Sequence, residues 1–169
     1  MNLKEHHLDQ IRILLHLKII TLKNLKMIVS LNKLNKERKK HLSDLYIKYS
    51  EEILKKKIKK KEVQINRIFN KVNFYVLIYY NSIACFFSVY ENVKKKNIYI
   101  RDFYTVPKFR KKGLSKKMFN YIKILADKIK ANYIYIDVLQ SNKKVVPFWK
   151  NLSFKKKLKY YEYKLHDSN

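Results

Sequence analysis

The chain contains one glycine, Gly113, and its position suits the binding of an anion. It follows a β-rich run that stops at Pro107 and precedes a stretch whose apolar residues have helical spacing. Glycine tolerates a positive φ and lets a ligand approach the backbone closely. The first turn of the next helix offers free N–H groups and the positive end of the helix dipole, a combination that binds pyrophosphate. Positive side chains surround this point: Arg110, Lys111, Lys112, Lys116 and Lys117. A tight strand-to-helix turn in a lysine-rich chain is the alternative interpretation of the same pattern.

Other reactive residue types lack the spacing that their chemistry requires. No G-x-x-x-x-G-K-[ST] loop occurs, and one glycine is too few for a dinucleotide-binding fingerprint. Cys85 is the single cysteine and lies in a predicted strand, so we expect a small buried residue and not a nucleophile. The five histidines show no ligand spacing beyond the adjacent His6 and His7. The sequence therefore predicts no metal site.

The elements that position Gly113 follow from the periodicity of the apolar residues. The predicted strands cover residues 14–20, 74–80, 83–90, 97–106, 133–138 and 154–165. The predicted helices cover residues 22–31, 45–65, 114–129 and 142–149. Thr21 is the expected N-cap of the first helix, Ser43 and Asp44 that of the second, and Asn81-Ser82 the turn of a hairpin.

This order, β-α-α-β-β-β-α-β-α-β, predicts an α/β fold. Its central sheet is mixed and mostly antiparallel, flanked by helices, with one strand–helix–strand crossover. No repeat or linker is visible, so we expect one domain over residues 1–169, with its core at about 14–165 and residues 1–13 as an N-terminal extension.

Residues 102–115, D-F-Y-T-V-P-K-F-R-K-K-G-L-S, resemble the acetyl-CoA segment of the GCN5-related N-acetyltransferases, the GNAT family. The family signature is (R/Q)-x-x-G-x-(G/A). Arg110 and Gly113 fit it, and Ser115 replaces the last small residue with another that is nearly as small and keeps its N–H. The match implies a GNAT-like fold with acetyl-CoA as co-substrate.

A second segment resembles the same family further along the chain. Asn142 matches the asparagine after the fifth strand of the family, and residues 148–154 are similar to its F-Y-x-x-x-G-F helix exit. Trp149 stands where the family usually has tyrosine, and Ser153 where it usually has glycine. The resemblance is strong over residues 97–165 and looser over residues 14–90.

The resemblance implies an acetyl-CoA-dependent N-acetyltransferase that moves an acetyl group directly to an amine, either a small amine or a protein or peptide amine. The residues that it places on the pantetheine arm are Phe103, Tyr104, Thr105 and Asn142, and those around the pyrophosphate are Arg110, Lys111, Lys112, Gly113, Leu114, Ser115 and Lys116. Asn142 could equally hold a catalytic water chain.

Two carboxylates compete for the role of general base. Asp137 matches the acidic position that several family members use, and Asp102 is the competitor. Alternation over residues 133–138 places Asp137 on one face with Tyr133 and Tyr135, whose rings would partly desolvate the carboxylate and raise its pKa. Either carboxylate could instead be a sheet-edge group paired with a lysine.

The general acid is left open by the sequence. The indole N–H of Trp149 cannot protonate a thiolate. Solvent is one source of the proton, and Tyr104, Tyr160 and Tyr161 are the candidate side chains.

The charge of the chain gives a second interpretation of its function. A net charge of +27 is typical of proteins that bind nucleic acid or an anionic surface. However, 35 of the 40 basic residues are lysine, and 19 isoleucines and 15 asparagines accompany only 3 alanines, a composition typical of AT-rich coding. The alternative function is therefore a catalytically weak, basic GNAT-fold module that binds nucleic acid or an acidic partner. The oligomeric state is open.

The sequence also bears on location. No apolar run reaches the roughly 18 residues that a membrane span needs. The N-terminus lacks the profile of a signal peptide. We therefore expect a cytoplasmic protein that does not bind membranes.

Overall fold

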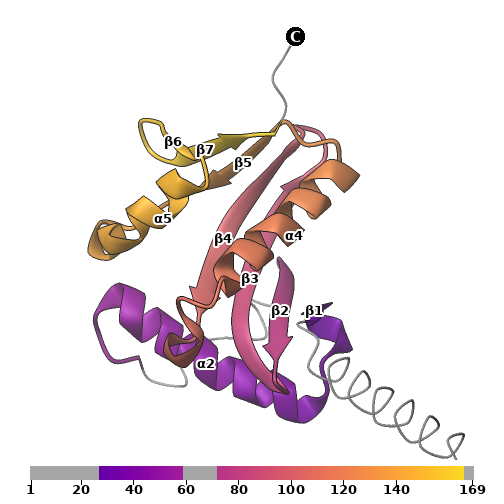
Figure 1. The fold of residues 1–169 in the computed structure, drawn as a ribbon, viewed down its shortest axis with the longest axis vertical. Coiled ribbons are helices and arrows are strands. Elements are labelled where there is room, and N and C mark those ends of the chain that lie inside the picture. The colour runs from indigo at the N-terminus through magenta and orange to yellow at the C-terminus, as the bar shows by residue number, and fades with distance from the viewer. Residues whose placement is uncertain (1–26, 59–71, 166–169) are drawn as a thin grey trace, which may run out of the picture.

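The structure is a computed structural model that describes residues 27–58 and 72–165 of the chain. Figure 1 shows an open, twisted sheet with helices packed against it. The described strands form one seven-stranded sheet in the order β1-β2-β3-β4-β5-β7-β6. Their bounds are Met27–Ser30 (β1), Asn73–Tyr79 (β2), Ser82–Asn92 (β3), Asn97–Thr105 (β4), Tyr133–Ile136 (β5), Lys155–Lys156 (β6) and Tyr161–Lys164 (β7). All neighbours pair antiparallel except β4 and β5, so the predicted α/β class and mixed sheet are confirmed.

Helices cover the two faces of this sheet and create two separate cores. Helix α2 (Lys36–Leu54) packs through Leu42, Leu45 and Tyr46 against one face. Helices α4 (Leu114–Lys128) and α5 (Val146–Asn151) pack against the other. The parallel pair β4–β5 requires a crossover, and α4 supplies it, as the sequence predicts.

The N-terminal elements correct the predicted ones. Residues 27–30 form β1 and not the end of a helix, because pairing with the edge of β2 overrides a weak helical pattern. Helix α2 begins earlier than predicted, since the Asn35 side chain caps it by accepting a hydrogen bond from the Arg38 N–H at 2.9 Å. Ser43 lies inside the helix, where its hydroxyl donates to the Lys39 carbonyl oxygen. The helix ends at Leu54, well before residue 65.

Some predicted elements fall on residues that the structure does not describe. The predicted strand over 14–20 and the Thr21 cap lie outside the described residues, as does the segment 59–65. Lys55, which follows α2, has φ +53, a left-handed residue that ends the helix.

Two turns also differ from expectation. The β2–β3 hairpin turns at Tyr80 and Asn81, one residue earlier than predicted, with φ values of +46 and +59. Positive φ at both positions is the type I′ geometry that matches the twist of a hairpin, reached here without glycine. The predicted last strand is the hairpin β6–β7, closed by a bond from the Lys157 N–H to the Tyr160 carbonyl oxygen at 2.8 Å.

Three short 3₁₀ helices connect the larger elements: η1 (Leu31–Lys33), η2 (Pro107–Phe109) and η3 (Gln140–Val145). The last two flank the region where β4 and β5 end. Within residues 27–58 and 72–165, no helix has the length and apolar character needed to cross a bilayer.

Candidate functional site

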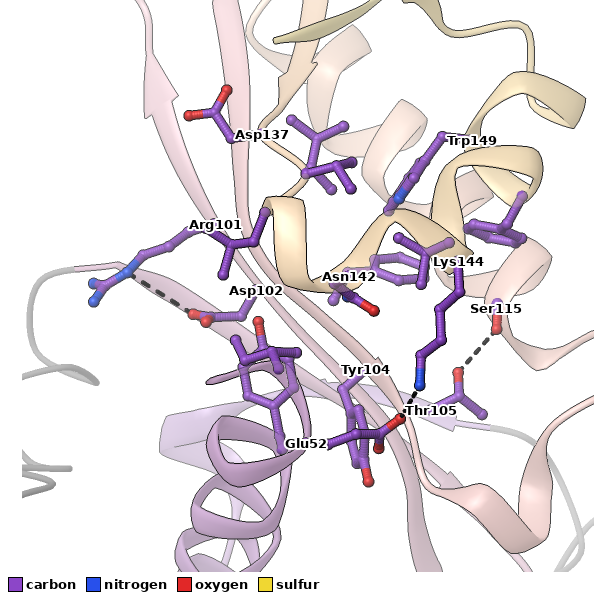
Figure 2. A pocket seen from close by; sticks show the side chains of 18 of the residues that line it. Glu52, Arg101, Asp102, Tyr104, Thr105, Ser115, Asp137, Asn142, Lys144 and Trp149 are labelled. Carbon is purple, nitrogen blue, oxygen red and sulfur yellow. Dashed lines mark hydrogen bonds and ion pairs between the residues drawn. The ribbon is translucent and has the colours of Figure 1, made fainter. Parts of the chain in front are cut away.

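A pocket of about 590 Å³ opens where β4 and β5 separate. The two strands pair only from Asn97↔Tyr133 to Ile100↔Ile136, after which β5 ends and β4 continues to Thr105. The unpaired edge of β4 is the floor of the pocket. Helix α2 lies on one side of it, and η3 and α5 lie on the other (Figure 2). Strand edges of this kind present free N–H and C=O groups to a ligand.

A β-bulge in β4 sets which side chains face this pocket. Ser88 of β3 pairs with Asp102, and the next residue of β3, Val89, pairs with Ile100, so Arg101 is an extra residue in β4. Before the bulge, Ile98 and Ile100 face the α4 core. After it the alternation is reversed, and Asp102 points toward α2. The bulge therefore turns a carboxylate into the pocket.

Gly113, two residues before the pocket-lining Ser115, begins α4 in the left-handed conformation, with φ +71. A Cβ added at Gly113 would meet no atom within 4 Å, so the backbone is open to approach at this residue. The Ser115 and Thr105 hydroxyl groups are 2.8 Å apart and tie this turn to the end of β4. The first N–H groups of a helix have no partner within the helix and lie at the positive end of its dipole, so a helix start of this kind can bind an anion.

The other predicted phosphate ligands occupy different surroundings. The Leu114 side chain is buried in the core, so only its backbone is available to a ligand. The three lysines of this segment are exposed and do not line the pocket: Lys111, Lys112 and Lys116. Lys111 has φ +60, and the ammonium of Lys112 lies 5.9 Å from the Phe109 ring centre.

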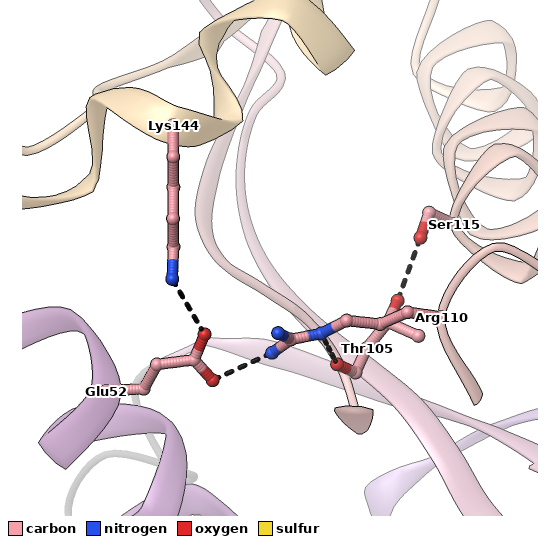
Figure 3. A network of polar contacts seen from close by, with 5 residues as sticks. All are labelled: Glu52, Thr105, Arg110, Ser115 and Lys144. Atoms are coloured by element: carbon pink, nitrogen blue, oxygen red, sulfur yellow. Dashed lines mark hydrogen bonds and ion pairs between the residues drawn. The ribbon is translucent and has the colours of Figure 1, made fainter. Parts of the chain in front are cut away.

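Arg110 is held by a carboxylate that the sequence analysis missed. Its Nη2 donates to Glu52 of α2 at 2.7 Å and its Nε to the Thr105 carbonyl oxygen at 3.0 Å (Figure 3). Lys144 of η3 donates to the other Glu52 oxygen at 3.2 Å. Partial burial alone would raise the pKa of Glu52, but its bonds and the charges of Arg110 and Lys144 lower it below the usual value. Glu51 and Glu52 are the only adjacent acidic pair in a lysine-rich chain, a signal that could have indicated Glu52.

A second contact joins the same two elements. The Ser141 hydroxyl of η3 donates to the Ile53 carbonyl oxygen of α2 at 2.7 Å. Together with the Glu52–Lys144 pair, it closes one side of the pocket.

Asp102 is buried at the base of the pocket, with 5% of its surface exposed. One carboxylate oxygen accepts a hydrogen bond from the Tyr46 hydroxyl at 3.1 Å, and the other accepts one from the Ser88 hydroxyl. Burial, together with the charge of Asp102, raises the pKa of Tyr46 and of Tyr49 well above the usual range for tyrosine. Their i, i+3 spacing in a helix was the available sequence signal for these two pocket residues.

Asp137 lies one residue beyond β5 at the rim of the pocket, apart from Asn142 and Trp149 (Figure 2). Its carboxylate accepts a hydrogen bond from the Tyr99 hydroxyl at 2.9 Å. Burial and this bond raise the pKa of Tyr99 to about 12. The expected shielding of Asp137 by Tyr133 and Tyr135 is wrong: Asp137 is exposed, and those two rings stack on each other.

The remaining predicted pocket residues come from η3, α5 and the end of β4. Asn142 lines the pocket at a kink inside η3, so it does not open a regular helix. Trp149 is buried, and its ring contacts Phe103 at a centroid distance of 4.9 Å. Tyr104 lines the pocket, and burial raises its pKa, whereas Tyr160 and Tyr161 lie outside the lining.

Cys85 is buried as predicted, and burial raises the pKa of its thiol to about 11. The Thr105 hydroxyl donates to its sulfur at 3.4 Å. A thiol in this state is a poor nucleophile. The described residues contain no group of three or more His, Cys, Asp or Glu side chains that could hold a metal ion.

Comparison with known proteins gives a family match over most of the chain. A family model described as "Acetyltransferase (GNAT) family" matches residues 37–154. No curated protein matches the chain.

Solved structures resemble this one in fold. A Staphylococcus aureus GNAT acetyltransferase has a TM-score of 0.65 at 15% identity, with 84% of this chain and 100% of that chain covered. A Streptococcus agalactiae acetyltransferase has a TM-score of 0.66 at 20% identity, with 82% and 98% covered. The ribosomal-protein-S18-alanine N-acetyltransferase of Escherichia coli has a TM-score of 0.63 at 11% identity, with 86% and 97% covered. At these identities the likeness shows the fold alone.

Proposed function

The chain belongs to the GNAT family of acetyltransferases, and on that premise we propose that it transfers an acetyl group from acetyl-CoA to an amine. One observation carries the proposal. A single pocket runs from Thr105 and Ser115, beside the start of α4, to the carboxylates of Asp102 and Asp137. A pocket of this kind can hold an anionic coenzyme at one end and an amine at the other.

Two groups of residues would hold acetyl-CoA, one at its pyrophosphate and the other at its pantetheine arm. We propose that the first turn of α4, from Gly113 to Lys116, binds the pyrophosphate together with Lys111 and Lys112, while Arg110 is tied to Glu52 and to the Thr105 carbonyl oxygen. The edge of β4 at residues 103–105 and the side chain of Asn142 bind the pantetheine arm. The solved structure of a putative streptothricin acetyltransferase from Bacillus anthracis, similar in fold at 17% identity, is a complex with acetyl coenzyme A.

When bound, acetyl-CoA supplies a thioester: the amine nitrogen forms a bond to its carbonyl carbon, the carbon–sulfur bond breaks, and the sulfur leaves as thiolate. Asp137 is the base that we propose for the amine proton, because its exposed carboxylate can be reached by an amine at the pocket rim. Asp102 is the competitor. Both of its oxygens already accept hydrogen bonds, from Tyr46 and Ser88, and it is far less accessible.

The leaving thiolate needs a proton, and of Tyr104, Tyr160 and Tyr161 only Tyr104 lines the pocket. Its raised pKa keeps the hydroxyl protonated at neutral pH. We propose Tyr104 as the general acid, with solvent as the competing source.

Calorimetry with acetyl-CoA and steady-state kinetics with a panel of amines test this function. In Asp137→Asn, kcat should fall by about 10²–10⁴-fold, the usual contribution of a positioned base, while acetyl-CoA affinity stays unchanged. Asp127→Asn on the exposed side of α4, outside the pocket, is the matched control. Full activity in Asp137→Asn with a large loss in Asp102→Asn would move the base to Asp102.

A further inference from the structure

Arg101 and Asp137 place two opposite charges at the end of the pocket where we propose that the amine binds. The inference drawn from them rests on the proposed function. Arg101 is the bulge residue of β4, and Asp137 is the first residue after β5. The last β4–β5 pair is Ile100↔Ile136, so these residues are the next neighbours across the gap between the strands. Both line the pocket. Figure 2 shows both on the side of the pocket away from Trp149 and Lys144.

The guanidinium of Arg101 is available to a ligand. In the described part of the chain, its one ion pair is a contact of 4.0 Å between Nε and the Asp102 carboxylate, at the outer limit for such a pair. The side chain is 40% exposed. Arg110, in contrast, is held by Glu52 and by the Thr105 carbonyl oxygen. The terminal nitrogens of Arg101 thus form a planar fork whose shape matches a carboxylate.

Asp137 provides the opposite charge at the same rim. Its carboxylate accepts one hydrogen bond, from Tyr99, and is otherwise exposed, which leaves acceptor capacity for an ammonium group. A cationic fork and an accessible carboxylate thus lie on neighbouring strand ends, and they are the two charges needed to bind a molecule that carries both.

We propose that the acetyl acceptor is a free amino acid. Arg101 binds the carboxylate of this acceptor, and Asp137 binds the adjacent ammonium group before it loses its proton. One further feature favours an acceptor with an anionic group: the net charge of +27 attracts anions from solution.

A purely structural role of Arg101 makes a different prediction. If its guanidinium served only to balance the charge of Asp102, its removal would lower kcat/KM to the same degree for every acceptor. If it binds the carboxylate of the acceptor, its removal lowers kcat/KM more for acceptors that carry a carboxylate than for those that lack one. The test measures this difference.

The experiment compares amino acids with the amines formed by removing their carboxylate: phenylalanine with phenethylamine, leucine with isoamylamine, and lysine with cadaverine. For the wild-type protein, kcat/KM should be about 10- to 100-fold higher for the amino acid in the best pair, the range of charge-assisted hydrogen bonds. Arg101→Gln should remove this preference by raising KM for the amino acid at least about 10-fold more than it raises KM for the decarboxylated amine. Arg38→Gln is the matched control, because Arg38 bonds to Asn81 outside the pocket.

Any of three results would overturn the inference, the first two of which concern the carboxylate preference. The first is a wild-type enzyme that uses the decarboxylated amines as well as the amino acids, and the second is an Arg101→Gln variant impaired equally with both. The third is a protein that binds acetyl-CoA in calorimetry and acetylates no amino acid in the panel. Failure to bind acetyl-CoA would refute the proposed function itself, so the two failures are distinguishable.

Discussion

Replacing Gly113 with alanine should lower folding stability only modestly. Gly113 has φ +71, and a Cβ added there meets no atom within 4 Å, so the penalty is conformational and not steric. A left-handed L-residue costs about 1–2 kcal/mol. The lower entropy of the unfolded alanine chain returns about 0.4–1 kcal/mol. The net loss of about 1 kcal/mol corresponds to a Tm about 2–4 °C lower for a chain of this size.

The same substitution should weaken acetyl-CoA binding much more than it weakens the fold. The new methyl group enters the open space that the proposed pyrophosphate site requires for close approach to the α4 backbone. Loss of one charge-assisted hydrogen bond costs about 1.5–3 kcal/mol, equivalent to a Kd about 10- to 150-fold higher. Thermal unfolding measures the first effect, and calorimetric titration with acetyl-CoA measures the second.

Asn81→Ala is the control, because it places alanine at another left-handed position, φ +59, in the β2–β3 turn outside the pocket. It also loses the 2.6 Å bond from Arg38, so it should unfold at lower temperature while its acetyl-CoA affinity stays unchanged. The expected loss of acetyl-CoA affinity in Gly113→Ala is at least about 10-fold. The pyrophosphate assignment would be refuted if the Gly113→Ala protein folds and its affinity for acetyl-CoA is within about twofold of the wild type. An equal loss of affinity in both variants would mean that binding follows stability.

Three further predictions concern other sites. Because burial raises the pKa of the Cys85 thiol to about 11, a disulfide reagent at neutral pH should label the native protein far more slowly than the unfolded one, and equal rates would contradict this. Ser153 has φ +67 after α5, so Ser153→Gly should raise stability by about 0.5–1 kcal/mol in guanidinium unfolding; a lower midpoint would contradict the strain. Glu52 has a lowered pKa, so its stabilising contribution is present at neutral pH and is lost as the pH falls through that value. The advantage of the wild type over Glu52→Gln in urea unfolding should therefore shrink as the pH falls below the usual glutamate pKa of about 4.3 and vanish once the pH is below the lowered native value. An advantage that does not shrink with falling pH would exclude this pairing as its source.

The second half of the fold could be predicted because its elements have strong local patterns. The strand 97–106 stops at a proline, and α4 has a wide apolar face that begins directly after the lone glycine. The first half depended on long-range pairing. β1 is a strand because it lies along the edge of β2, and no local pattern indicates that edge.

The candidate site shows the same division. The Gly113 segment is contiguous in sequence and could be found by its residue types. The bulge at Arg101 could not, because a register shift in β4 is defined only by its pairing with β3, and it reverses the face on which Asp102 lies. Glu52 contacts Arg110 across 58 positions of sequence, a separation that local periodicity does not address.

Transfer of an acetyl group from acetyl-CoA to an amine by this chain must yield two products, the acetylated amine and free coenzyme A. Its most direct test is to incubate the protein with acetyl-CoA and the amine panel and to quantify, by mass spectrometry and thiol titration, the acetylated amine and the free coenzyme A. Equal amounts of both products should form only when acetyl-CoA and an amine are present together, and both amounts should be strongly reduced in Asp137→Asn. Release of thiol without an acetylated amine, or no product with any amine, would refute the transfer.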